Sequence, residues 1–259
     1  MNSFSIIIVN WNGLDHLKKY LPSVVASNYE AFEVIIADNG SSDQSIEWVK
    51  QEFPEIKVIA LDQNYFFAGG NNRASKIANH EWLVFLNNDV QVDPNWLDQM
   101  SNMIEDNPNA GILQPKIKSL NQPSYFEYAG AAGGYLDRFG YPYCRGRIWD
   151  VVEKDTGQYN HPSKVDWASG AAMFIKKDLF EQLNGFDEDF EMHMEEIDLC
   201  WRARNVGIEV MYCPESVVYH LGGGSLSQGS FKKIWYNYRN NWYMLVKNVS
   251  NQQFISTLS

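Results

Sequence analysis

The sequence has 259 residues, of which 45% are hydrophobic, and its 21 Lys and Arg against 32 Asp and Glu give a formal net charge of -11. A chain of this length and apolar content can bury a substantial core, so we expect a globular protein. The acidic balance excludes a broad cationic surface for nucleic acid, so a polyanionic partner must be held locally. The 3 cysteines lack Cys-x-x-Cys spacing, which is typical of a protein from a reducing compartment without a disulfide framework or zinc knuckle.

The N-terminus does not read as a signal peptide, because residues 1–9 contain no basic residue and their apolar run is short. No apolar stretch approaches the roughly 18 residues of a membrane-spanning helix. We therefore expect a cytoplasmic protein, with a peripheral position at the inner face of the cell membrane as the alternative.

Strands and helices alternate in the first part of the chain. Apolar runs that end in polar residues predict strands at residues 4–9, 32–37, 56–61 and 82–86, and helical spacing predicts helices at residues 14–25, 46–53 and 70–79. This succession implies right-handed crossovers and an α/β fold with a single, mostly parallel central sheet flanked by helices.

Each of these strands ends in a polar or acidic tip. The tips are Asn10, Asp38, the loop around Asn64, and the pair Asn88 and Asp89. Because parallel strands share a direction, the tips are expected to converge on one edge of the sheet, where ligands bind in open α/β folds. Ordinary turn formation explains any one tip but explains the set less well. We therefore place a ligand site at this edge, centred on Asn88 and Asp89.

The pattern changes past Pro108. Residues 110–117 predict a strand, residues 125–136 a glycine-rich, hairpin-like segment, and residues 137–164 a long irregular excursion. The stretch around Trp167, Ser169 and Gly170 is rich in small residues, which let a ligand approach closely. A strand and a helix at residues 177–183 follow, ended by Gly185.

An acidic helix is predicted from Glu195 to Asn205. Glu195, Glu196 and Asp198 occupy its N-terminus, where the helix dipole favours ionised carboxylates, so helix electrostatics and chemistry are both open explanations. Asp198 also lies four residues before Arg202, a spacing that predicts an ion pair.

The last third ends in a histidine and an aromatic helix. Strands are predicted at residues 209–212 and 217–219, and His220 follows the second one beside a glycine-rich run at residues 221–225. This position makes His220 a candidate ligand for metal or phosphate, although a single histidine also suits a structural role. Residues 230–246 predict an aromatic, basic helix that either packs on the domain or lies on a membrane surface.

Taken together, these stretches resemble the family 2 glycosyltransferases of the GT-A fold, in particular bacterial rhamnosyltransferase-like members. The resemblance rests on SIIIVNWNG at residues 5–13, VIIADNGSSD at 34–43, NYFFAGGNN at 64–72, LNNDV at 86–90, GFD at 185–187, EEIDLCWR at 195–202 and VVYH at 217–220. It implies one GT-A domain in which residues 1–107 bind the nucleotide sugar and residues 108–229 form an elaborated acceptor-binding and catalytic half. Residues 230–259 would form a C-terminal helix that is membrane-associating or truncated.

The same resemblance implies roles for individual residues. The donor would be bound by Asn10, Asp38, Asn64, Gly69, Asn72 and Asn88, and the acceptor by Trp167, Ser169 and Gly170. Asp89 and His220 would hold Mg²⁺ or Mn²⁺ at the donor's diphosphate. Glu196 would be the general base, with Glu195 as the alternative and Asp198 shaping the same corner.

The implied reaction is an inverting, metal-dependent transfer of a hexose from a dTDP- or UDP-sugar, with rhamnose suggested by the resemblance. The acceptor would be a glycan or lipid-linked molecule in cell-surface polysaccharide synthesis. Two other classes stay open. A sugar nucleotidyltransferase would release pyrophosphate, but it typically has a basic, glycine-rich loop at the first strand, which this chain lacks. A non-catalytic carbohydrate-binding module would bind glycan without nucleotide or metal.

Overall fold

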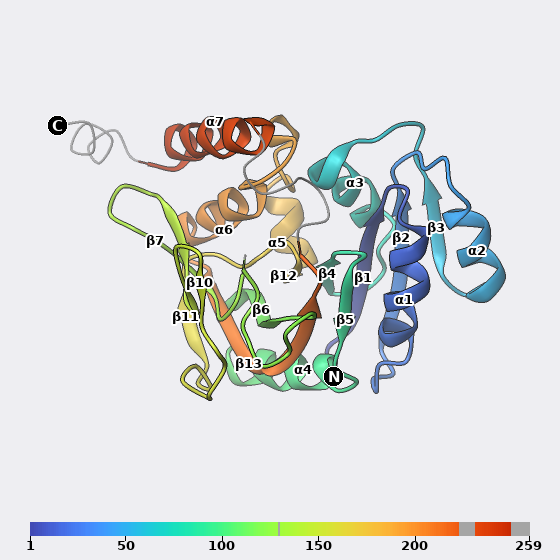
Figure 1. Cartoon of the computed structure of the whole chain (residues 1–259), viewed down its shortest axis with the longest axis horizontal. Coiled ribbons are helices and arrows are strands. Elements are labelled where there is room, and N and C mark those ends of the chain that lie inside the picture. The colour runs from blue at the N-terminus through green and yellow to red at the C-terminus, as the bar shows by residue number, and fades with distance from the viewer. Residues whose placement is uncertain (129, 223–230, 250–259) are drawn as a thin grey trace.

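A computed structural model describes residues 1–128, 130–222 and 231–249 of the chain. Its first half contains four parallel strands, as predicted, with β1 (Phe4–Asn10) paired to both β2 (Phe32–Asp38) and β4 (Trp82–Leu86), and β3 (Lys57–Ala60) paired to β2 (Figure 1). The connections are α1 (Leu14–Val25), α2 (Ser45–Glu52) and α3 (Phe66–Ser75). The strand tips therefore meet at one edge of the sheet.

Helices cover both faces of this sheet because its strands are apolar on both sides. Ile6 and Ile8 of β1 face a core that includes side chains of α1, α2 and α4 (Trp96–Asp106). Ile7 faces the opposite core, built with α3, α5 (Lys177–Gln182) and α6 (Glu195–Asn205). The α/β expectation is confirmed, and α6 has the predicted bounds.

The second half makes the sheet mixed instead of mostly parallel. β12 (Ala172–Lys176) is antiparallel to both β4 and β6 (Ala110–Ser119), whereas β13 (Glu209–His220) is parallel to β6. β5 (Val90–Val92) and β11 (Ser163–Val165) pair antiparallel with β13. The two strands predicted at 209–212 and 217–219 are one strand with a register shift between Cys213 and Val217.

Other predicted boundaries also differ. α3 begins at Phe66 instead of residue 70, so Gly70 lies inside the helix. A side chain at this position would press on Val9 and Asn39, which explains the glycine there. The predicted hairpin-like and irregular segments share one hairpin, in which β7 (Gly134–Leu136) pairs with β8 (Pro142–Cys144). A second small hairpin joins β9 (Arg147–Ile148) to β10 (Val151–Val152). The glycine-rich run predicted after His220 lies outside the described residues from 223 onward.

The remaining helical elements lie near the end of the chain. A short 3-10 helix, η1 (Glu188–Phe190), precedes α6, and α7 (Phe231–Asn248) packs against both of them. α7 thus covers the segment that leads into the acidic helix (Figure 1).

Candidate active site

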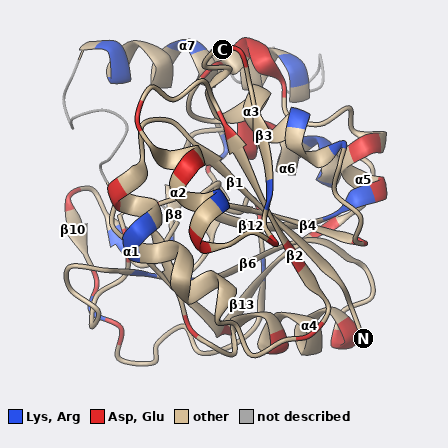
Figure 2. Ribbon diagram, turned by 90° about the vertical axis from the view of Figure 1, so that its right-hand side faces the viewer, with Lys and Arg blue, Asp and Glu red and all other residues tan. Residues whose placement is uncertain are grey.

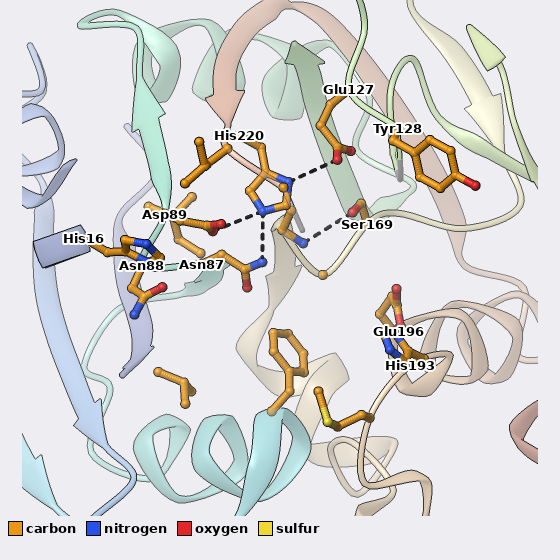
Figure 3. Close-up of a pocket in the computed structure, with 18 of the residues that line it drawn as sticks. His16, Asn87, Asn88, Asp89, Glu127, Tyr128, Ser169, His193, Glu196 and His220 are labelled. Atoms are coloured by element: carbon orange, nitrogen blue, oxygen red, sulfur yellow. Dashed lines mark hydrogen bonds and ion pairs between the residues drawn. The ribbon is translucent and has the colours of Figure 1, made fainter. Parts of the chain in front are cut away.

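A cavity of about 1150 Å³ lies at the edge where the strand tips meet. Asn88 and Asp89, which follow β4, line one part of it, and Glu195 and Glu196 at the start of α6 line another. Ser169 lies between them, as Figure 3 shows. The fold therefore brings the two predicted acidic regions, far apart in the sequence, to one cavity.

Asp89 and His220 form the first corner of this cavity. Asp89 Oδ1 lies 3.1 Å from His220 Nε2, and the side chains are only 8% and 11% exposed. Glu127 Oε1 lies 3.5 Å from His220 Nδ1, on the other side of the ring (Figure 3). The imidazole is therefore held between two carboxylates.

The charges of this corner depend on one another. Burial alone lowers the pKa of His220, but hydrogen bonding to Asp89 and Glu127 and their negative charges outweigh burial and raise the pKa to about 10. Burial favours the neutral form of Asp89, yet the bond to His220 and its charge hold the pKa of Asp89 below its ordinary value. Without other ligands, the corner holds an imidazolium and a carboxylate at neutral pH.

The donor set of this corner fits a divalent cation. Asp89 offers a carboxylate and His220 an imidazole nitrogen, and His220 would give up the Nε2 proton that it shares with Asp89 when an ion binds. Among the described residues, no group of three or more His, Cys, Asp or Glu side chains has the arrangement to hold a metal ion by itself. Substrate phosphate oxygens would therefore have to complete the coordination of Mg²⁺ or Mn²⁺.

Glu195 and Glu196 form the second corner. Burial and the charge of Glu196 raise the pKa of Glu195 well above its ordinary value. Burial also raises the pKa of Glu196, but backbone hydrogen bonds, including one from Gly170, favour its ionised form. Glu195 is 5% exposed, whereas Glu196 is partly exposed. Because the two carboxyls interact, ionisation of one disfavours ionisation of the other, and the pKa of Glu195 is the more strongly raised of the two.

Asn10 and Asp38 lie behind the cavity wall. Both are buried, and Asn10 Nδ2 donates to Asp38 Oδ1 at 3.1 Å. Asn10 Oδ1 accepts from Asn88 Nδ2 at 3.0 Å, and Gly13 leaves the room for this contact. The side chain of Asn10 thus positions Asn88, while a direct contact of Asn10 or Asp38 with the donor stays a prediction.

The other predicted donor residues divide in the same way. Asn64 lines the cavity, whereas Gly69 packs against Tyr65 and Arg73. Asn72 is tied to the backbone of Phe186 by two hydrogen bonds of 2.8 and 2.9 Å. Neither Gly69 nor Asn72 is among the residues that line the cavity.

Two of the three predicted acceptor residues line the cavity, namely Ser169 and Gly170. Trp167 is 5% exposed, and its indole nitrogen donates to Tyr135 O at 3.0 Å. Its ring fills the place that a side chain at Gly134 would take. Trp167 therefore packs under the wall.

Asp198 faces away from the cavity. Its carboxylate is completely buried and accepts from Arg202 Nε at 2.8 Å, Lys247 Nζ at 2.9 Å and Asn248 Nδ2 at 2.8 Å. The predicted ion pair with Arg202 is confirmed. Asp198 joins α6 to α7, and this contact network is a structural one.

Glu127 and His193 are two of the cavity residues that the sequence did not reveal. Glu127 lies in an irregular segment without periodicity, so nothing local predicted its contact with His220. His193 lies beside Glu196 (Figure 3), and burial together with the charge of Lys233 lowers its pKa to about 4. His193 is therefore neutral in the cavity at physiological pH.

Several known proteins are similar to this chain in sequence. The sequence profile described as Glycosyl transferase family 2 matches residues 5–183. The N-acetylglucosaminyl-diphospho-decaprenol L-rhamnosyltransferase of Mycobacterium tuberculosis is 25% identical over 229 residues, which cover 83% of this chain and 75% of the relative. Rhamnosyltransferase WbbL of Escherichia coli is 26% identical over 226 residues, covering 83% of this chain and 82% of the relative.

Two solved structures share the fold. GalNAc-T7 with UDP, GalNAc and Mn²⁺ superposes with a TM-score of 0.74 at 17% identity over 95% of this chain, which spans 48% of GalNAc-T7. The mannosyltransferase PcManGT from Pyrobaculum calidifontis, in complex with GDP-Man and Mn²⁺, gives 0.67 at 13% identity over 99% of this chain and 68% of its own. The chain thus has the GT-A fold and spans about half the length of the first of these proteins.

We expect Asp198→Asn to lower the free energy of unfolding by about 1.5–3 kcal/mol, because it weakens charge-assisted hydrogen bonds inside the protein. Urea unfolding measures the loss, and Asp178→Asn, at an exposed position in the first turn of α5, is the control. A stable Asp198→Asn protein that binds nucleotide but has lost sugar transfer would instead make Asp198 catalytic.

Proposed function

The chain belongs to glycosyl transferase family 2, and from this membership we propose that it moves a sugar from a nucleoside diphosphate sugar to a hydroxyl of a glycan or lipid-linked acceptor, with inversion. The observation that carries the proposal is the cavity in which the Asp89 and His220 corner and the Glu195 and Glu196 corner both open. One corner suits the departing diphosphate, and the other suits the acceptor hydroxyl. Family membership favours this function over a nucleotidyltransferase or a binding module.

Glu196 is the proposed general base. Its Oε2 is buried and has no hydrogen-bond partner among the described residues, so it is available to accept a proton. As the acceptor oxygen bonds to the anomeric carbon, the hydroxyl proton passes to Glu196 and the bond from that carbon to the diphosphate oxygen breaks. Burial raises the pKa of Glu195 well above its ordinary value, which disfavours a second negative charge beside Glu196.

Asp89 and His220 are the proposed holders of the divalent cation. When bound there, Mg²⁺ or Mn²⁺ offsets the charge that builds on the leaving diphosphate. Asn88, fixed by Asn10, and Asn64 line the part of the cavity that we assign to the donor. Rhamnose as the sugar is supported by the names of both rhamnosyltransferase relatives, and a lipid-linked acceptor by the name of the Mycobacterium tuberculosis relative.

We further propose that α7 lies on an anionic membrane surface, close to such an acceptor. Its outward face exposes a stripe of apolar and aromatic side chains: Phe231 83%, Trp235 55%, Tyr238 65%, Trp242 51% and Val246 66%. The helix has no acidic residue (Figure 2), and of its basic residues Arg239 and Lys247 are paired with Glu191 and Asp198, whereas Lys232 and Lys233 lie in its first turn. Trp and Tyr beside basic residues are typical of helices in the membrane interface. None of the helices among the described residues has the length and apolar character that crossing a bilayer requires.

Glu196→Gln should lower the turnover number by about 10²- to 10⁴-fold while nucleotide binding is kept, because the base is lost but its shape is not. Glu195→Gln should lose far less. The measurement is release of nucleoside diphosphate from dTDP-, UDP- and GDP-sugars with lipid-linked glycan acceptors. In the wild type, the rate should rise with pH above the ordinary glutamic acid pKa, because burial raises the pKa of Glu196. An unaffected Glu196→Gln enzyme ends the assignment.

The double variant Trp235→Glu/Trp242→Glu should no longer float with vesicles that contain phosphatidylglycerol, whereas the wild type should. Trp149→Glu is the control, because Trp149 is 88% exposed on the β9–β10 connection, away from α7 in the sequence. If the wild-type protein does not bind the vesicles, or if both variants lose binding equally, the proposal that α7 contacts the membrane is wrong.

A further inference from the structure

The segment before α6 has an unusual backbone. Glu191, His193 and Met194 have positive φ angles of 59°, 69° and 72°. A left-handed conformation costs a residue with a side chain about 1–2 kcal/mol, so such a turn persists only where its surroundings hold it. Met194 is the N-cap of α6, and Glu195 and Glu196 follow directly. The position of both acids therefore depends on this turn.

Asn240 of α7 holds the turn. The side chain is 0% exposed, and its Nδ2 lies 2.9, 2.7 and 2.8 Å from the carbonyl oxygens of Phe190, Met192 and His193, so its two protons are shared among three acceptors. Asn240 Oδ1 accepts from Arg239 Nε at 2.9 Å. The amide therefore has one acceptable orientation, because the reverse one would direct an oxygen at three carbonyl oxygens.

Neighbouring residues of α7 support the same turn. Arg239 Nη2 donates to Phe190 O at 2.9 Å, and Arg239 Nη1 lies 3.2 Å from Glu191 Oε1. Tyr236 donates its hydroxyl proton to Glu191 Oε2 at 2.6 Å. Residues three and four apart share a helix face, so these three side chains meet the turn together.

We propose that Asn240 is a positioning residue for sugar transfer, which fixes the start of α6 and thereby the place of Glu195 and Glu196 in the cavity. The catalytic meaning of this inference rests on the proposed function, but the positioning itself does not. A displacement of about 1 Å at a reacting group can cost about 10²-fold in rate, and that is the loss we expect when the turn is released.

Residues that only attach α7 to the rest of the domain have different contacts from those of Asn240. The adjacent Asn241, 5% exposed, donates to Gly140 O in the β7–β8 turn at 3.2 Å. Asn248 and Lys247 bind Asp198. α7 is thus attached at several other points, whereas all three carbonyl oxygens within reach of Asn240 Nδ2 lie in the segment that leads into the acids.

The test compares Asn240→Asp with Asn241→Asp in the whole chain. The first change directs a carboxylate at three carbonyl oxygens and should release the turn, and the second makes the same chemical change one residue away. Carboxyl ¹³C NMR titration of Glu195 and Glu196 needs neither donor nor acceptor. In the wild type and in Asn241→Asp the pKa of Glu195 should stay well above its ordinary value, because the side chain is buried. In Asn240→Asp it should fall towards that value, and the turnover number should fall about 10²-fold with unchanged nucleotide binding.

A folded Asn240→Asp protein that keeps the raised Glu195 pKa would overturn the inference, and so would equal effects of the two variants. If Asn240→Asp does not fold, Asn240→Ala, which removes the donor without adding charge, gives the same comparison. The assignment of Glu196 as the base is tested separately. If that assignment is wrong, the Glu196→Gln enzyme keeps its activity, whatever the titration of the Asn240 variants shows.

Discussion

The contact between Asp89 and His220 links the segment after β4 to the end of β13 at one corner of the cavity, and the proposed cation site depends on it. Asp89 follows β4 of the parallel half, whereas His220 ends β13 of the mixed half. Backbone contacts hold the same two segments together: His220 is paired with Val90, and Leu221 N donates to Asp89 O at 3.1 Å. Two side chains that are distant in the chain thereby become neighbours, and the buried carboxylate and imidazole compensate each other's charge.

The opposite corner of the cavity is held by other means. Sheet register sets the place of Asp89, but Glu195 and Glu196 lie at the start of a helix whose entry turn is held from outside by α7. α7 exposes its other face to solvent, and apolar and aromatic side chains lie along that face. If that face lies on a membrane, as proposed, the binding surface and the acidic pair are linked through one rigid element.

Much of the fold and part of the candidate site could be predicted from local sequence patterns. The buried strand before Asn88 and Asp89, the helix from Glu195 to Asn205, and the convergence of strand tips followed from apolar runs and their spacing. The family and the GT-A fold were also identified from the sequence and are confirmed.

What could not be predicted depends on long-range contacts. The antiparallel direction of β12 is set by the chain between β6 and β12, which has no periodic signal. Glu127 is an ordinary acidic residue until folding places it against His220. Asn10 and Asp38 are polar at strand ends, yet burial turns them towards each other. Spacing alone did not indicate which neighbours Asp198 would have besides Arg202.

Calorimetric titration of dTDP, UDP and GDP, each with and without Mn²⁺ or Mg²⁺, tests the central claim most directly. We predict that one of these diphosphates binds, that the divalent cation strengthens its binding, and that folded Asp89→Asn protein loses the effect of the cation. Equal affinity with and without the cation, or no binding of any of the three to the folded protein, would contradict a diphosphate site at Asp89 and His220.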